Sequence, residues 1–195
     1  MNNKRLYDSS VLRPFLISAS LYIAAFELLK NAINKRIEEF FMIGYDCKNR
    51  NRQKEYDEEM KLYREKHKDK KDKKTYASLD WLVDFGAVTK VDIKVYDEVR
   101  EFRNKIAHEM IGLTYENLPE NQEMLNKHFV AMFDLLRKIE IYWTLNVDIP
   151  CNPDFDGKEI KADDVFPGPV LMMRILCKEA LGTTGSSLKA SYYPK

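Results

Sequence analysis

The sequence predicts an all-α protein, built as an antiparallel helical bundle with two long helices and shorter helices between them. Two long stretches of the chain repeat apolar residues at steps of three and four, which is the spacing of a helix face. Glycine and proline number only seven each in 195 residues, which is few for an all-β fold, and they gather toward the C-terminus. No internal repeat, glycine-rich phosphate loop or alternation of strands and helices accompanies them.

The first long helix is predicted over about residues 11–43. Pro14 falls in its opening turn, where a missing N–H costs little. Additional apolar residues beside the main stripe widen the apolar surface, so we expect this helix to contact more than one neighbour. The stripe is Leu12, Leu16, Ala19, Ile23, Phe26, Ile33, Ile37 and Phe40, and the widening residues are Tyr22, Ala25, Leu28 and Leu29.

A charged insert follows Gly44, at about residues 46–75, and ends in the lysine-rich run 66–74. Tyr56, Met60 and Tyr63 have the spacing to line one helix face. One interpretation is a solvated helix and flexible loop. The other is a lysine-rich arm that touches phosphates, although interspersed acidic residues count against it.

Two shorter helices are predicted next. Ser78 to Gly86 reads as a short helix capped by serine and stopped by glycine. Thr89 and Asp92 have the spacing of a capping box that opens another helix, and the segment 111–120 is expected to be a loop. The apolar stripe of this second short helix is Val95, Val99, Phe102 and Ile106.

The second long helix is predicted over about residues 120–145. Residues 1–150 are therefore expected to form the helical bundle. Residues 151–195 are expected to be an irregular segment with a short helix near 170–181 and a tail, packed on the same domain. The stripe of the second long helix is Leu125, Phe129, Met132, Leu136, Ile139 and Trp143.

Composition favours a soluble cytoplasmic protein. The formal net charge is +1, so any electropositive site must be local. Cys47, Cys151 and Cys177 are widely spaced and indicate neither a disulfide framework nor a zinc site. The N-terminus lacks the apolar run of a signal peptide, and the apolar stretch 21–29 is too short to cross a bilayer, so no membrane association is expected.

Residues 99–110 read VREFRNKIAHEM and carry the main functional candidates, Arg103, Asn104 and His108. On a regular helix Asn104 and His108 project nearly opposite the apolar stripe, and Arg103 lies about 140° from His108 around the axis. Arg103 and His108 of one chain therefore make a poor catalytic pair. The simplest alternative for His108 is a solvent-facing residue near a helix C-terminus, where a cationic imidazole is favourable.

The Arg103–His108 string, R-N-x-x-A-H, resembles the motif of the HEPN (higher eukaryotes and prokaryotes nucleotide-binding) superfamily, in which Arg precedes His and Asn commonly follows the Arg. The resemblance covers about residues 11–145, with a capped helix and a glycine before the motif-bearing helix and long helices on either side. It implies a metal-independent endoribonuclease, acting as a toxin or antiviral-defence effector, with a composite site across the two-fold axis of a homodimer. It also implies RNA as substrate and a cognate antitoxin or regulatory protein as a possible partner.

The same resemblance assigns roles. His108 would act as acid and base, Arg103 would hold the scissile phosphate, and Asn104 would orient His108 or donate to phosphate. Substrate-binding residues would be Lys105, Arg100 and the acidic Glu27 on the first helix. No cofactor and no metal are expected. Toxins of this family that are controlled by nucleotidyl modification carry a tyrosine two residues after the histidine; here that residue is Met110, and nearby Tyr115 does not fit the pattern.

Two other functions stay open. In the first, the chain is a catalytically silent HEPN-like module that binds nucleotide, RNA or a protein partner. In the second, it is an all-helical interaction protein whose contact surface is the charged insert. His67 is assigned to the charged loop and His128 to packing at a helix edge.

Overall fold

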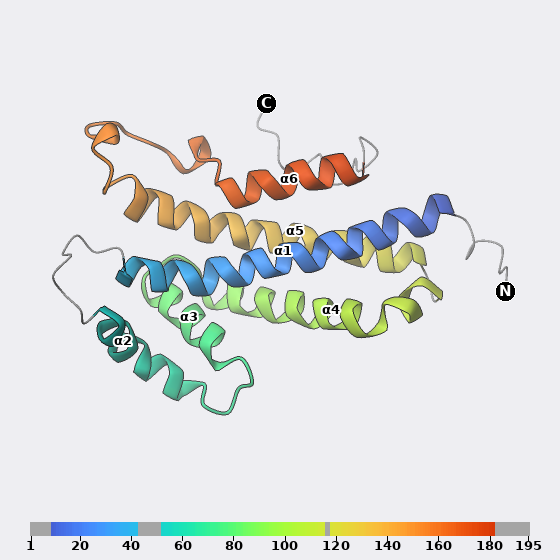
Figure 1. Ribbon diagram of the computed structural model, residues 1–195, viewed down its shortest axis with the longest axis horizontal. Coiled ribbons are helices and arrows are strands. Elements are labelled where there is room, and N and C mark those ends of the chain that lie inside the picture. Colours follow the sequence, from blue (N-terminus) through green and yellow to red (C-terminus); the bar gives the residue numbers. More distant parts are fainter. Residues whose placement is uncertain (1–8, 43–51, 116–117, 182–195) are drawn as a thin grey trace. The chain divides into compact units, whose positions relative to one another are not determined.

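The computed structural model describes residues 9–42, 52–115 and 118–181, and within these ranges it contains helices and no strand, which confirms the all-α prediction. Short π- and 3-10-helical segments, Thr144–Asp148, Pro153–Phe155 and Ala162–Asp164, follow the fifth α-helix. The α-helices, drawn in Figure 1, are α1 (Ser9–Met42), α2 (Arg52–Lys66), α3 (Lys73–Asp84), α4 (Lys90–Tyr115), α5 (Leu118–Trp143) and α6 (Gly168–Leu181).

Some predictions fall outside the described residues. These are Gly44 and Cys47, the first residues of the charged insert, and the tail after residue 181.

The chain divides into two compact units, each made of separate stretches of sequence. Unit 1 comprises Met1–Glu27, Lys94–Leu135 and Phe166–Lys195, and unit 2 comprises Leu28–Ile93 and Leu136–Val165. Helices α1, α4 and α5 therefore contribute residues to both units. The predicted boundary near residue 150 and the HEPN-like arrangement of the bundle stay predictions.

Tyr22 organises the core of unit 1. Its hydroxyl donates to the Val99 carbonyl at 3.0 Å, and its ring meets those of Phe102 and Phe129 edge-on at 5.4 and 5.6 Å between centroids. One residue thus ties α1 to α4 and α5, and edge-on aromatic pairs add stability beyond the area they bury. Complete burial of the ring raises the pKa of Tyr22 above its usual range, which keeps the hydroxyl protonated as a donor.

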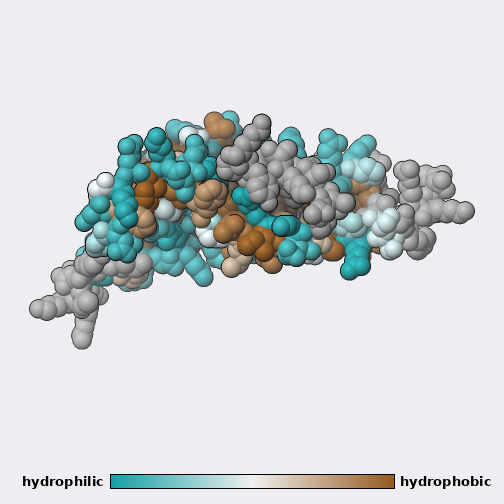
Figure 2. Space-filling view, turned by 90° about the horizontal axis from the view of Figure 1, so that it is seen from above, coloured by the Kyte–Doolittle hydropathy of each residue, from teal (hydrophilic) through white to brown (hydrophobic). Residues whose placement is uncertain are grey.

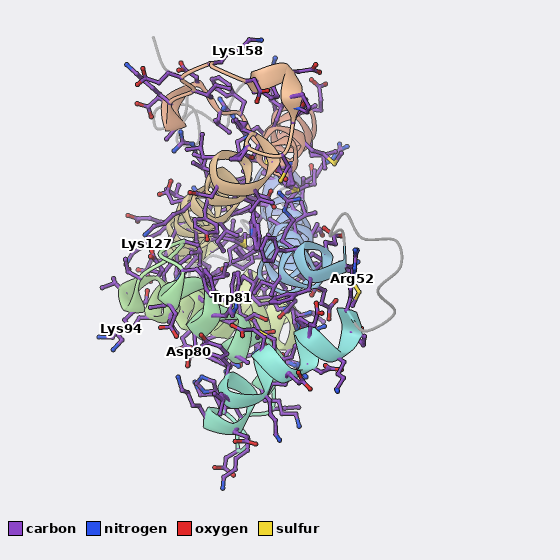
Figure 3. The ribbon with its side chains drawn as sticks, turned by 90° about the vertical axis from the view of Figure 1, so that its left-hand side faces the viewer. Arg52, Asp80, Trp81, Lys94, Lys127 and Lys158 are labelled. Atoms are coloured by element: carbon purple, nitrogen blue, oxygen red, sulfur yellow. The ribbon has the colours of Figure 1, made fainter. Side chains whose placement is uncertain are left out.

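Stacked tryptophans organise the core of unit 2. The rings of Trp81 on α3 and Trp143 on α5 are nearly parallel, with centroids 6.0 Å apart, and Trp81 lies inside the bundle of side chains in Figure 3. Phe85 stacks on Trp81 at 4.0 Å. Helix α2 packs on α3 and buries Tyr56 and Met60, as their spacing predicts.

The prediction that Ser78 caps α3 is wrong. The helix begins at Lys73, and Ser78 is fully buried inside it. Asp72 precedes the first turn instead and accepts a hydrogen bond from the Thr75 hydroxyl at 2.9 Å. The predicted stop is confirmed, because Gly86 adopts a left-handed φ of 77° just after the helix, where a side chain would be strained.

The predicted capping box at the start of α4 is confirmed. The Thr89 N–H donates to the Asp92 carboxylate at 2.6 Å, and the Asp92 N–H donates back to the Thr89 hydroxyl at 3.4 Å. Hydrogen bonds from Lys138 and Thr89 outweigh the opposing effect of burial and lower the pKa of Asp92 below its usual value.

The predicted loop at 111–120 is wrong, because α4 continues to Tyr115 and α5 begins at Leu118. Gly112 therefore lies within a helix. The Asn121 side chain donates to the Leu113 carbonyl at 2.8 Å, which satisfies a backbone group near the end of α4 that the helix leaves open. Helix α4 is kinked at Glu109, directly after His108, where φ and ψ have the non-helical values −122° and 17°.

Both predicted long helices bury their stripes, to different extents. Every predicted stripe residue of α5 is buried. In α1 the stripe residues Ala19, Phe26, Ile33 and Ile37 are buried, Leu12 and Ile23 are half-buried, and Leu16 and Phe40 toward the ends of the helix are exposed. Wide burial on α1, including Tyr22, Ala25 and Leu29, agrees with a helix that contacts several neighbours.

By length and composition alone, residues Leu12–Met42 of α1 qualify as a membrane-spanning helix. The prediction of no membrane association used the length of the shorter apolar stretch 21–29. The whole helix is longer, so its length does not exclude a membrane span. The central helix of a bundle meets the same two criteria, and Leu29, Ile33 and Ile37 of α1 are fully buried. The cytoplasmic location stays a prediction.

Helix α6 has apolar side chains on two faces. It buries Val170, Met173 and Cys177, and burial raises the pKa of the Cys177 thiol to about 11. Figure 2, viewed from above Figure 1, shows brown apolar side chains among teal hydrophilic ones on this surface. The exposed apolar residues of α6 are Leu171, Met172, Ile175 and Leu176.

Candidate functional site

The motif lies on a stretch of α4 whose inner face is fixed by packing in unit 1. Val99, Phe102 and Ile106 are buried, while Asn104 and His108 are exposed. Backbone geometry is helical up to His108, so the side chains alternate between core and solvent as the 3.6-residue repeat requires. The predicted division of this helix into an apolar stripe and an opposite polar face holds for these residues.

Arg103 is positioned by α1. Its Nη2 lies 3.0 Å from Oε1 of Glu27, and its guanidinium carbon lies 5.6 Å from the centroid of the Phe26 ring. Its Nη1 also contacts Oδ1 of Asn104 at 3.4 Å, a long and weak hydrogen bond. A carboxylate, an aromatic ring and a neighbouring amide therefore hold the guanidinium in one place, which leaves further N–H donors on it for a ligand.

The ion pair between Arg103 and Glu27 is weak enough to exchange. The side chains are 30% and 52% exposed. Surface pairs with this much solvent contribute only about 0–1 kcal/mol, because water screens the attraction. A phosphate group that approaches Arg103 would thus compete with Glu27 on nearly equal terms.

His108 stands apart from Arg103. Five residues of helix separate their backbones by about 7.5 Å of rise and about 140° of rotation. The His108 side chain is exposed, so its imidazole is accessible to a ligand or to a second copy of the chain. One chain does not bring Arg103 and His108 to a common point, as the helical geometry predicts.

The kink at Glu109 follows the histidine directly. A non-helical residue interrupts the ladder of backbone hydrogen bonds, so the helix changes direction there. His108 is thus the last residue before the change, and Met110 lies beyond it. The side chain of Tyr115 lies outside the described residues.

The other candidate residues occupy the same helix. Lys105 is exposed and Arg100 is half-buried, one turn before Arg103. Asn104 contacts Arg103, and no contact within the described residues joins it to His108. Lys105 is thus open to solvent, whereas the Arg100 side chain is only partly exposed.

No family model, curated protein or solved structure matches this chain significantly. The resemblance to HEPN ribonucleases therefore stands on the residues of Arg103–His108 and on the order of the helices around them.

Sequence reasoning did not find every contact of the site. Phe26 was assigned to the stripe of the first helix, and its ring lies beside the Arg103 guanidinium. Arg103 and Glu27 are 76 residues apart, so no local pattern signals their pairing. In unit 2, Nε2 of His67 lies 2.9 Å from Oδ2 of Asp80, at hydrogen-bond distance, a contact that its place in a charged run does not suggest.

His128 packs at the edge of unit 1, as predicted. Its ring stacks on Phe102 with centroids 4.6 Å apart. Burial, with the nearby Lys127, lowers the pKa of His128 against the opposing charge of Glu98, so the neutral form is favoured. A histidine held in this way serves packing.

Metal-binding chemistry has no evident place among the described residues. Over these ranges, no three His, Cys, Asp or Glu side chains gather closely enough to hold a metal ion.

Proposed function

We propose that the chain is a metal-independent endoribonuclease of the HEPN type, which cuts RNA as a homodimer with a site composed of both copies. The observation that carries the proposal is the state of the motif on α4. His108 and Asn104 are exposed, and Arg103, which contacts Asn104, is held by the Glu27 carboxylate that a phosphate can displace. A toxin or antiviral-defence effector is the biological role that the resemblance implies.

The composite site follows from the separation of the two groups. Because Arg103 and His108 diverge on one helix, a second motif facing the first across a two-fold axis would supply the missing partner. Two histidines and two arginines would then surround one phosphate. Each arginine would arrive already in contact with the Phe26 ring, which lowers the entropy lost on binding.

The reaction uses the 2′-hydroxyl of RNA. One His108 removes the proton of the 2′-hydroxyl, and the 2′-oxygen attacks the adjacent phosphorus. The bond between phosphorus and the 5′-oxygen breaks, and the second histidine protonates the leaving oxygen. Arg103 displaces Glu27 to hold the phosphate oxygens and stabilises the charge that grows on them. The products are a 2′,3′-cyclic phosphate and a 5′-hydroxyl, and DNA is not cut.

The first test is cleavage of mixed cellular RNA in EDTA by the wild type, His108→Ala and a matched control. Glu123→Ala is suitable because Glu123 is exposed on α5 in the same unit. We expect His108→Ala to lose about 100- to 10,000-fold in rate. Wild type and Glu123→Ala should give equal amounts of cyclic phosphate. Equal cleavage by His108→Ala would refute the assignment.

The second test asks whether the site is shared. Wild type mixed with an excess of His108→Ala forms, after subunit exchange, heterodimers that hold a single His108 where the mechanism uses two. Cleavage that falls more steeply than the amount of wild-type chain supports a site composed of both chains, and cleavage that stays proportional to the wild-type chain contradicts it. RNA binding without cleavage by the wild type would favour the silent binding module instead.

A further inference from the structure

The turn between α2 and α3 in unit 2 carries a concentration of exposed positive charge. We define the lysine tip as Lys66, Lys68, Lys70, Lys71 and Lys73, all of which are exposed. Two exposed carboxylates, Glu65 and Asp69, lie among them. Lysines outnumber carboxylates here by five to two, so the turn is strongly basic although the chain is nearly neutral.

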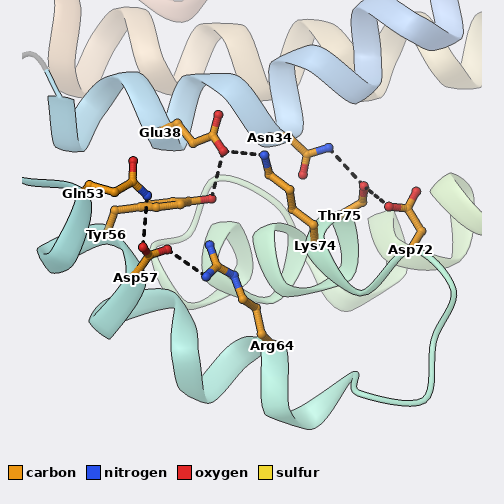
Figure 4. A network of polar contacts seen from close by, with 9 residues as sticks. All are labelled: Asn34, Glu38, Gln53, Tyr56, Asp57, Arg64, Asp72, Lys74 and Thr75. Atoms are coloured by element: carbon orange, nitrogen blue, oxygen red, sulfur yellow. Dashed lines mark hydrogen bonds and ion pairs between the residues drawn. The ribbon is translucent and has the colours of Figure 1, made fainter.

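Other acidic residues near the turn do not cancel the positive charge of the lysine tip, because these residues contact groups that do not belong to the tip. Asp72 pairs with Lys30 of α1 at 3.0 Å, and its pKa is lowered by hydrogen bonds from Lys30 and Thr75 in spite of burial. The Asp80 carboxylate lies at hydrogen-bond distance, 2.9 Å, from Nε2 of His67. Figure 4 shows that Lys74, which follows the tip, is in turn bound by Glu38 of α1. The sequence-based objection that interspersed acidic residues weaken a phosphate-binding arm is thereby reduced.

The lysine tip is also fixed in shape. Backbone hydrogen bonds run from the His67 N–H to the Arg64 carbonyl at 3.2 Å and from the Lys70 N–H to the His67 carbonyl at 3.0 Å. The ammonium of Lys70 lies 3.4 Å from the centroid of the Tyr76 ring. A cation over an aromatic face is attracted by the electron-rich face of the ring, so this lysine loses less freedom when it meets an anion.

We propose that the lysine tip is a sequence-independent binding surface for the phosphate backbone of RNA. Lysine presents compact charges that neutralise phosphates and read no bases, and such contacts supply most non-specific affinity. A membrane surface fits less well, because Leu62 is the one large apolar side chain exposed on α2 and α3 and membrane-binding helices need an apolar face. The inference rests on the proposed function only in naming RNA as the polyanion.

The test uses the full chain with His108→Ala, so that RNA stays intact, and a fluorescent single-stranded RNA of mixed sequence. Substituting all five lysines of the tip with glutamine should weaken binding about 10- to 100-fold at low salt. It should also reduce the slope of log K against log salt by about 3. A matched variant changes five exposed lysines elsewhere, Lys90, Lys94, Lys127, Lys161 and Lys178, to glutamine and should change binding far less.

The proposal would be overturned if the tip variant bound RNA as tightly as the unsubstituted chain. It would also be overturned if both lysine variants lost equal affinity, or if none of the proteins bound RNA. Vesicles with anionic lipids serve as a second probe, and tip-dependent binding to vesicles without tip-dependent binding to RNA would also overturn it. Circular dichroism checks that both variants are folded. Failure of the ribonuclease would appear separately, as cleavage that does not depend on His108, whereas the lysine tip is judged by binding alone.

Discussion

Arg103 of α4 and Glu27 of α1 form an ion pair of 3.0 Å, so the arginine of the motif is held by a residue of the first helix. The pair joins the site to the fold of unit 1. Because the same carboxylate neutralises the guanidinium, Glu27 orients Arg103 and at the same time opposes its contact with phosphate.

Glu27→Gln should therefore strengthen RNA binding. Removal of a carboxylate that competes with phosphate is expected to tighten binding about two- to five-fold at low salt, which is the worth of an exposed ion pair. Stability to urea should change by less than about 1 kcal/mol. Glu58→Gln is a matched control because Glu58, in unit 2, forms an exposed ion pair with Lys54, with 3.6 Å between Oε1 and Nζ. Weaker binding by Glu27→Gln would mean that orientation of Arg103 outweighs competition.

Loss of the capping box should destabilise α4. Thr89→Ala removes the hydroxyl that accepts from the Asp92 N–H and donates to its carboxylate, and it should lower the free energy of unfolding by about 1 kcal/mol. Urea denaturation followed by circular dichroism measures the change. Thr89→Ser keeps the hydroxyl and should retain most of the stability. Equal losses in both variants would point to packing of the threonine methyl group.

The buried Thr75 should be needed for its hydroxyl. It accepts from Asn34 Nδ2 at 3.0 Å and donates to Asp72 at 2.9 Å. Thr75→Val keeps the shape but leaves the Asn34 amide without this acceptor, at a cost of about 1–3 kcal/mol. Thr75→Ser is the control with the hydroxyl retained. Thermal unfolding of the three proteins side by side would reveal the order, and a valine variant as stable as wild type would rule out this role.

His128 should make stability depend on pH. Its pKa is lower in the folded state than the ordinary value of 6.5, so the unfolded chain binds more protons as the solution is acidified through that range. The free energy of unfolding should then fall as pH drops below about 6.5 and level off below the folded pKa. In His128→Phe, which keeps a ring against Phe102, this part of the pH dependence should disappear. Urea titrations at several pH values compare the slopes, and identical slopes would count against the assignment.

Local signals in the sequence predicted much of the fold. The apolar stripe of α5 is regular because one face of the helix is buried over its whole length. The start of α4 was predictable because Thr89 and Asp92, three residues apart, contact each other directly. Where tertiary contacts decide, prediction failed. Helix α3 begins at Lys73, before Ser78, and its first turn is contacted from α1, where Lys30 pairs with Asp72 and Asn34 donates to Thr75. Helix α4 passes through Gly112, and Asn121 of α5 donates to a carbonyl near its end.

The site divides in the same way. Exposure of Asn104 and His108 follows from their offset from the buried residues of the same helix. Their neighbours from other helices do not follow, since the contact of Arg103 with Glu27 and Phe26 spans distant parts of the chain. A kink at Glu109 has no proline or glycine at that position to signal it.

The two tryptophans of the chain, Trp81 and Trp143, both belong to unit 2, where they stack. Intrinsic tryptophan fluorescence consequently reports on unit 2 alone. Unit 1, which carries Arg103 and His108, contributes no tryptophan signal. Fluorescence and circular dichroism would follow the same denaturation curve only if both units unfold together. A spectroscopist could thus learn whether the motif-bearing half loses structure by itself without attaching any label to the protein.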